Sequence, residues 1–215
     1  MQQWWSDLWE GILELPLWGW GILAALILLG LWLLRGSRGQ HKPWSTRMVA
    51  AGALSVSLAF LLSCIVVFRM PQGGSITLAS MLPLFFFAFA YGPSPGIAAG
   101  IVYGLLQLMQ GATIVHPVQF ALDYIFPFAV LGLVGFVRND RQWSLAILFA
   151  CLLRFAIHTA SGAIFFATYA PEGQNAWLYS AGYNASYMVP ETVICVAVLL
   201  VPQVKAALLK IKAQA

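Results

Sequence analysis

Polar and ionisable side chains interrupt strongly apolar stretches of this sequence, and they are its best candidates for chemistry. Asp123 and Tyr124 are adjacent within one apolar run. A larger group lies between positions 154 and 191: Arg154, His158, Ser161, Tyr179, Asn184 and Glu191. An ionisable group at membrane depth is costly, so each indicates a functional site or a buried ion pair.

The composition predicts the environment of these residues. The chain has 215 residues, of which 61% are hydrophobic and 8% charged. A soluble domain carries about a quarter charged residues. A membrane helix takes about 20 residues, so the length accommodates six or seven spans. We therefore predict an all-α membrane protein.

Apolar runs predict seven spans and three regions. The spans fall at about 17–34, 48–68, 76–91, 97–111, 118–137, 143–169 and 178–201. Residues 1–45 form a Trp-rich segment with one extra span and a basic loop, residues 46–203 a six-helix domain, and residues 204–215 a basic tail. The link GPSPG is predicted to be a tight turn because proline and glycine interrupt helices.

Lysine and arginine predict the orientation. Placing the first loop in the cytoplasm gathers most basic residues on that side: Arg35, Arg38, Lys42, Arg47, Arg138, Arg141, Lys205, Lys210 and Lys212. Arg69 alone remains on the outer side. This bias predicts a multi-pass protein of the cell membrane with its N-terminus outside and its C-terminus in the cytoplasm.

The rise of a helix places the polar residues in two layers. Asp123 lies five residues into its span, about 8 Å deep at 1.5 Å per residue. The outer layer comprises Asp123, Tyr124, Gly162, Phe166, Tyr179 and Asn184, and the inner layer Arg154, His158 and Glu191.

The two layers predict different chemistry. Asp123 has no expected basic partner at its depth, so with nearby aromatic rings it is typical of a receptor for an organic cation. The alternative is a core carboxylate capped by hydroxyl groups. His158 is either a ligand-binding or a packing histidine. Arg154 and Glu191 are predicted to form a structural ion pair.

The sequence contains no motif for ATP hydrolysis or for metal binding. The sequence has no P-loop, so the chain should carry no ATPase of its own. Cys64, Cys151 and Cys195 lack metal-site spacing, and we expect neither a metal nor a cofactor.

Three ordered motifs resemble a known family. Residues 73–108, the segment IVHPVQFALDY at 114–124, and residues 154–191 closely resemble the thiamine-specific substrate-binding (S) component of energy-coupling-factor (ECF) transporters. The resemblance covers about residues 46–202. It implies a six-helix fold, high-affinity binding and uptake of thiamine, and no enzymatic activity. It also implies partnership with a coupling subunit and two ATP-binding subunits.

The resemblance also implies roles for individual residues. The family's acidic residue, which meets the aminopyrimidine end of thiamine, corresponds to Asp123, with Tyr124 beside it. The other substrate-binding positions fall on His158, Gly162, Phe166, Tyr179 and Asn184. The lid loop falls on Pro71, Gln72, Gly73 and Gly74, and a small-xxx-small docking motif on Ala53 and Ser57. The extra N-terminal span departs from the family pattern.

Two alternatives remain at this stage. The first is an S component for another small vitamin or a thiamine precursor. A phosphorylated ligand is disfavoured because only Arg69 could reach the outer layer. The second is an intramembrane hydrolase using Ser161, His158 and Asp123, although the segment around Ser161 lacks the usual nucleophile turn.

Overall fold

The computed structural model describes residues 44–215. The predicted extra span at 17–34 and almost all of the N-terminal region therefore lie outside the described residues. The remaining six predicted spans lie within them.

The described chain is a helical bundle with one small hairpin. Its α-helices are α3 (Thr46–Ser63), α4 (Leu82–Tyr91), α5 (Pro93–Gln107), α6 (Pro117–Phe120), α7 (Phe126–Ala129), α8 (Trp143–Phe165), α9 (Ala176–Leu200) and α10 (Pro202–Gln214). Between α6 and α7 lies a π-helical turn, η3 (Ala121–Ile125), and after α7 comes the 3-10 segment η4 (Val130–Phe136). Shorter 3-10 turns are η2 (Leu108–Gln110), η5 (Asp140–Gln142) and η6 (Ala167–Tyr169).

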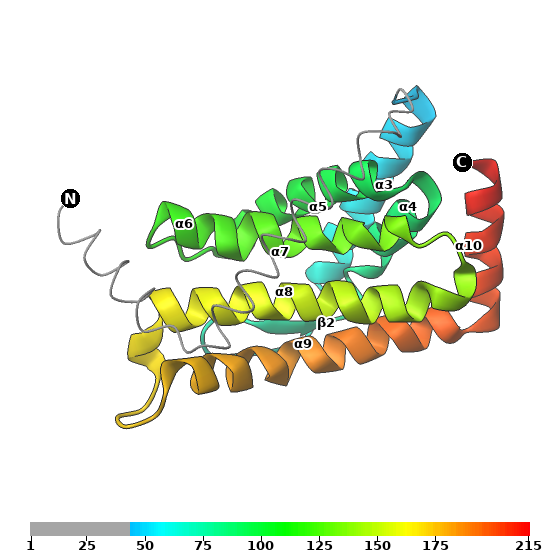
Figure 1. The fold of residues 1–215 in the computed structure, drawn as a ribbon. Coiled ribbons are helices and arrows are strands. Elements are labelled where there is room, and N and C mark those ends of the chain that lie inside the picture. The colour runs from blue at the N-terminus through cyan, green and yellow to red at the C-terminus, as the bar shows by residue number, and fades with distance from the viewer. Residues whose placement is uncertain (1–43) are drawn as a thin grey trace.

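The arrangement supports a multi-pass membrane protein. Four continuous helical segments are long and apolar enough to cross a membrane: Thr46–Ser63, Pro117–Phe136, Asp140–Phe165 and Ala176–Leu200. In Figure 1, α8 and α9 run side by side, and α10 stands across the end of this pair.

The predicted span at 76–91 is only partly helical. Its first residues belong to strand β2 (Ser75–Thr77), which pairs antiparallel with β1 (Val66–Arg69). Helix α4 then begins at Leu82 and has 10 residues. Met70 N–H donates to Gly74 O at 2.7 Å across the hairpin, so the predicted lid loop is the turn of a β-hairpin.

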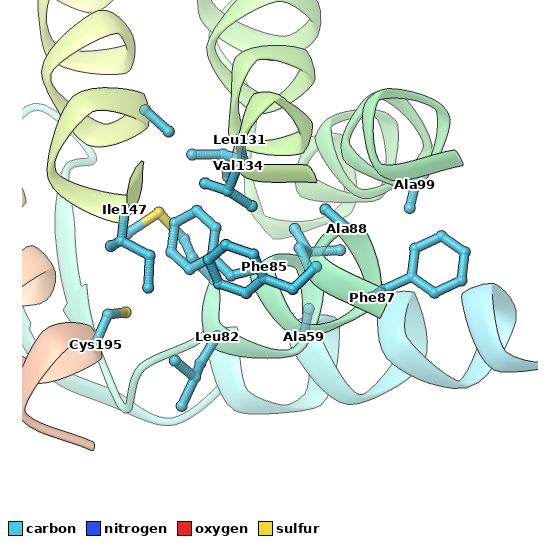
Figure 2. Close-up of a cluster of buried hydrophobic side chains, with 14 of the residues drawn as sticks. Ala59, Leu82, Phe85, Phe87, Ala88, Ala99, Leu131, Val134, Ile147 and Cys195 are labelled. Carbon is cyan, nitrogen blue, oxygen red and sulfur yellow. The ribbon is translucent and has the colours of Figure 1, made fainter. Parts of the chain in front are cut away.

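The apolar core lies between α4, η4 and the start of α8. Figure 2 shows Phe85 among Leu131, Val134 and Ile147. Phe89 stacks on Trp143 with ring centroids 4.6 Å apart. Because lipid is as apolar as these side chains, close packing rather than transfer from water holds such helices together.

The C-terminal tail is a packed helix. Leu208 of α10 is buried, Lys205 Nζ lies 2.9 Å from Asp140 Oδ2, and Lys212 Nζ donates to Arg138 O at 2.7 Å. The helix begins at Pro202, within the region predicted to end at 203. The prediction of a simple basic tail missed this packing, since the lysines drew attention away from the apolar residues Val204 and Leu208, which pack on the core.

Glycines set the spacing between α5 and the segment 117–136. A Cβ atom on Gly100 would lie 2.1 Å from Phe128 O, and one on Gly104 would lie 1.8 Å from Tyr124 O. These contacts are with backbone atoms, which cannot rotate away. The two helices therefore approach at backbone distance, and this approach positions Tyr124.

We predict that Gly100→Ala lowers the thermal unfolding midpoint in detergent, because the helices must separate to admit the methyl group. Overpacking of this kind costs about 1–3 kcal/mol. Gly182→Ala is the control, since Gly182 is exposed on α9 and its added Cβ would meet nothing within 4 Å. This control should be neutral or stabilising because alanine favours a helix. Equal midpoints for the two variants would contradict the prediction.

Candidate functional site

A cavity of about 260 Å³ lies under the hairpin, between α5, the segment 117–136, α8 and α9. It is lined by every residue predicted to bind substrate: Asp123, Tyr124, His158, Gly162, Phe166, Tyr179 and Asn184. Gln72, Gly73 and Gly74 of the predicted lid also line it, whereas Pro71 does not. Arg154 and Glu191 line the same cavity. The residues of the two predicted layers therefore line a single cavity.

Asp123 is held by two side chains. Gln119 Nε2 donates to Asp123 Oδ2 at 2.6 Å, and His158 Nδ1 lies 3.3 Å from Asp123 Oδ1. The expectation that Asp123 lacks a basic partner was wrong. Counting residues from the span ends placed His158 deeper than Asp123, but the packing of α8 brings both to one level.

The chain around Asp123 forms an unusually wide turn. In η3 the Phe126 N–H donates to Ala121 O, five residues back. Pro127 lies four residues after Asp123. Because proline has no N–H, it cannot donate the usual helical hydrogen bond to the Asp123 carbonyl. Such π turns occur often at functional sites. Pro127 was the signal in the sequence for this irregularity.

The hydrogen-bonding of His158 follows from Asp123. In a neutral imidazole that donates to the carboxylate, Nδ1 carries the proton and Nε2 has a free lone pair. Nε2 is buried and has no hydrogen-bond partner among the described residues. The ring of His158 thus lies beside the carboxylate with Nε2 enclosed in the cavity wall.

Arg154 and Glu191 lie at the far side of the cavity from the hairpin tip. Arg154 Nη1 is 3.9 Å from Glu191 Oε2, within ion-pair distance. Glu191 also accepts from the Thr77 hydroxyl and from Ser80 Oγ at 3.0 Å. The carboxylate is thus surrounded by donors from β2 and the turn before α4, which the sequence did not reveal.

One face of α9 presents three tyrosines at intervals of four residues. Tyr183 OH accepts from Gly74 N–H at 2.9 Å, and Tyr179 OH accepts from Gln72 Nε2 at 2.9 Å. These bonds tie the hairpin over the cavity. Tyr183 and Tyr187 line the cavity but were not predicted, although their spacing with Tyr179 was visible in the sequence.

The side-chain amide of Asn184 makes hydrogen bonds within its own helix, α9. Its Nδ2 donates to Ser180 O at 2.9 Å, and its Oδ1 accepts from Tyr187 OH at 2.6 Å. These bonds fix the side chain at the cavity wall, where it is almost fully buried.

Gly162 and Phe166 shape the adjoining wall. A Cβ atom on Gly162 would lie 2.3 Å from Ser180 Oγ, so glycine permits the contact between α8 and α9. Helix α8 ends at Phe165, and Phe166 has φ −128° and ψ 26°. The expectation that Phe166 continues the helix was wrong; its ring instead stacks on Tyr169, with centroids 5.9 Å apart.

The predicted docking residues lie away from the cavity. Ala53 and Ser57 are exposed on α3. Ala51 and Ser55, on a neighbouring face of the helix, help to line a second, apolar cavity of about 420 Å³ between α3 and α4.

The hydrolase constellation is not assembled. His158 Nδ1 meets Asp123, but neither His158 Nε2 nor Ser161 Oγ has a hydrogen-bond partner among the described residues. Ser161 is fully buried and does not line the cavity. A hydroxyl so placed is neither activated by the histidine nor accessible to a substrate.

A helical membrane bundle that encloses a cavity lined by polar and aromatic groups defines a small-molecule-binding membrane protein. The family model described as "Thiamine transporter protein (Thia_YuaJ)" matches residues 49–211. The chain belongs to this thiamine transporter family, as the motifs predicted.

Individual relatives agree with this assignment. The chain is 41% identical over 145 residues to the thiamine transporter ThiT of Bacillus subtilis, covering 60% of this chain and 75% of that one. It is 29% identical over 141 residues to ThiT of Lacticaseibacillus paracasei, covering 56% and 70%. A solved structure of ThiT from Listeria monocytogenes shares the fold, with a TM-score of 0.67 at 21% identity over 77% of this chain and 96% of that one.

We predict that Glu191→Gln strongly destabilises the bundle, since it leaves the Arg154 guanidinium buried without its counter-charge. Breaking a buried pair costs about 3–5 kcal/mol, measurable as a lower unfolding midpoint in detergent. The control is Asp140→Asn, which breaks the half-exposed pair with Lys205. A solvent-exposed pair contributes little to stability, so this variant should leave the midpoint nearly unchanged.

A double variant tests the origin of that loss. Arg154→Met combined with Glu191→Gln removes both charges, so it should cost less than the sum of the single changes. Additive losses would show that the two groups are not energetically coupled.

Proposed function

We propose that this chain is the thiamine-binding S component of an ECF-type transporter and takes up thiamine across the cell membrane. The observation that carries the proposal is that one cavity collects all seven predicted substrate-binding residues in a chain of the thiamine transporter family. Thiamine joins an aminopyrimidine ring to a cationic thiazolium ring, so its site needs both hydrogen-bonding groups and a favourable environment for a cation.

The charge of the cavity suits a cation. Two carboxylates, Asp123 and Glu191, and one guanidinium, Arg154, line it. With His158 neutral the lining carries one excess negative charge, and Arg154 is already paired with Glu191. A phosphate ester would meet this excess without a free cationic partner, which favours thiamine over its phosphorylated forms.

The polar groups divide between the two rings of the ligand. Asp123, with the ring of His158 beside it, suits the amino group of the pyrimidine ring. Phe166, stacked on Tyr169, offers an aromatic face to the thiazolium cation. Tyr179 and Asn184 complete the α9 wall, and the hairpin tip closes over the ligand through Gln72 and Gly74.

Uptake requires other subunits that hydrolyse ATP and couple hydrolysis to transport. Without a P-loop it would rely on two ATP-binding subunits and a coupling subunit, the latter docked on α3 at Ala53 and Ser57. The chain itself performs no covalent chemistry. In the predicted orientation the hairpin faces outside and α10 faces the cytoplasm, so thiamine enters beneath the hairpin.

We expect calorimetric titration of the purified protein to detect thiamine binding and Asp123→Ala to weaken it at least about thirtyfold. Losing one partner of a buried charged contact costs about 2 kcal/mol or more. His158→Ala should also weaken binding. The control is Asp140→Ala, a carboxylate that lies outside the cavity. Wild-type protein that binds another vitamin but not thiamine would refute the assignment of substrate.

A second prediction concerns docking. We expect Ser57→Trp to leave thiamine affinity of the isolated subunit unchanged but to abolish co-purification with the coupling subunit, because small residues permit close helix approach. Leu152→Trp on α8 is the control, since Leu152 is 60% exposed on a different helix. Normal assembly of the Ser57 variant would exclude this face as the docking surface.

A further inference from the structure

Gln119 occupies an exceptional position in the motif HPVQFALDY. It lies on α6 one turn before Asp123 and is 1% exposed. Helix α6 begins where His116 Nδ1 accepts from Val118 N–H at 2.9 Å, and this cap fixes the direction of the helix. A glutamine buried this completely requires a partner for each polar atom.

The orientation of the Gln119 amide is determined by the backbone. Thr113 O, which can only accept, lies 3.1 Å from Nε2. Val115 N–H, which can only donate, points to Oε1 at 3.1 Å. The nitrogen and oxygen of the amide therefore cannot be exchanged. The second N–H of Nε2 is directed at Asp123 Oδ2.

This arrangement restricts Asp123 to one role. Gln119 can present only a donor to Oδ2, so that oxygen must act as an acceptor. Oδ1 faces His158 Nδ1. Each carboxylate oxygen therefore has its own partner, and together the two contacts fix the orientation of the carboxylate. A carboxylate fixed in this way offers its remaining lone pairs to a ligand donor and repels a ligand acceptor.

Gln119 also joins the carboxylate to the loop at 111–116. Besides the bonds to Thr113 and Val115, Thr113 N–H donates to Tyr124 OH at 3.2 Å. Thr113 and Gly111 line the cavity. Asp123 lies within the wide η3 turn (Ala121–Ile125), and these side-chain bonds link that turn to the loop.

We propose that Gln119 is a positioning residue that makes the site selective for a ligand with a donor at Asp123. This inference rests on the proposed thiamine function and names a residue that acts through Asp123. Its three hydrogen bonds use every polar atom of its amide. It selects the 4-amino group of thiamine against oxythiamine, which carries a carbonyl oxygen at that position.

The test is calorimetric titration of the full-length protein with thiamine and with oxythiamine. Gln119→Met keeps the size of the side chain and removes its hydrogen bonds, whereas Gln119→Glu keeps the shape and replaces the donor by an acceptor. Each should weaken thiamine binding at least about tenfold. A hydrogen bond to a charged group contributes more free energy than a tenfold change in affinity requires. The preference for thiamine over oxythiamine should shrink in both.

Gln110→Met is the matched control. Gln110 Nε2 donates to Ser63 Oγ at 2.6 Å and Gln110 does not line the cavity, so this variant should keep both affinities. If Gln119→Met does not yield folded protein, the Gln119→Glu result decides alone.

Two results would overturn the proposal. One is wild-type thiamine affinity in the folded Gln119 variants. The other is an equal loss for thiamine and oxythiamine, which would indicate a general disturbance of the cavity. Wild-type protein that fails to bind thiamine would instead refute the proposed function, and the two failures are therefore distinct.

Discussion

A carboxylate inside a hydrophobic bundle must be surrounded by donors, and this requirement organises the whole cavity. Asp123 accepts a hydrogen bond from Gln119 and faces His158. Glu191 accepts hydrogen bonds from two hydroxyl groups and lies beside Arg154. These donors come from segments distant in sequence. Satisfying the two carboxylates therefore fixes the hairpin, the segment 117–136, α8 and α9 relative to one another.

The bundle can meet this requirement only because its helices approach closely. Gly100 brings the backbone of α5 against Phe128, and Gly162 brings α8 against Ser180 of α9. The absence of a Cβ at these points lets the segments that line the cavity come into direct contact. The apolar core around Phe85 supports one end of the bundle, which leaves the other end to accommodate polar groups.

The sequence was sufficient to predict the helical membrane class, the family and a set of candidate residues that the structure brings to one cavity. It failed where spatial packing departs from residue counting. His158 was assigned to a deeper layer than Asp123, since the relative positions of two helices are not encoded in either alone. Gln119 was overlooked because a buried glutamine is recognisable only through its partners. The tip of the hairpin was predicted as a loop, but its strand residues were included in the ends of the spans predicted at 48–68 and 76–91, because so short a run shows no clear periodicity.

The two ends of the hairpin are held unequally. Its tip is tied to α9 by Gln72 and Gly74 through tyrosine hydroxyls, and Gln72 is exposed to solvent. Its base is tied by Thr77, which is buried with Glu191. Hydrogen bonds exposed to water exchange readily for bonds to water, whereas breaking the buried bond would leave a carboxylate short of a donor. Opening at the tip therefore costs less free energy than detaching the base, so access to the cavity can change while Glu191 and Arg154 keep their surroundings.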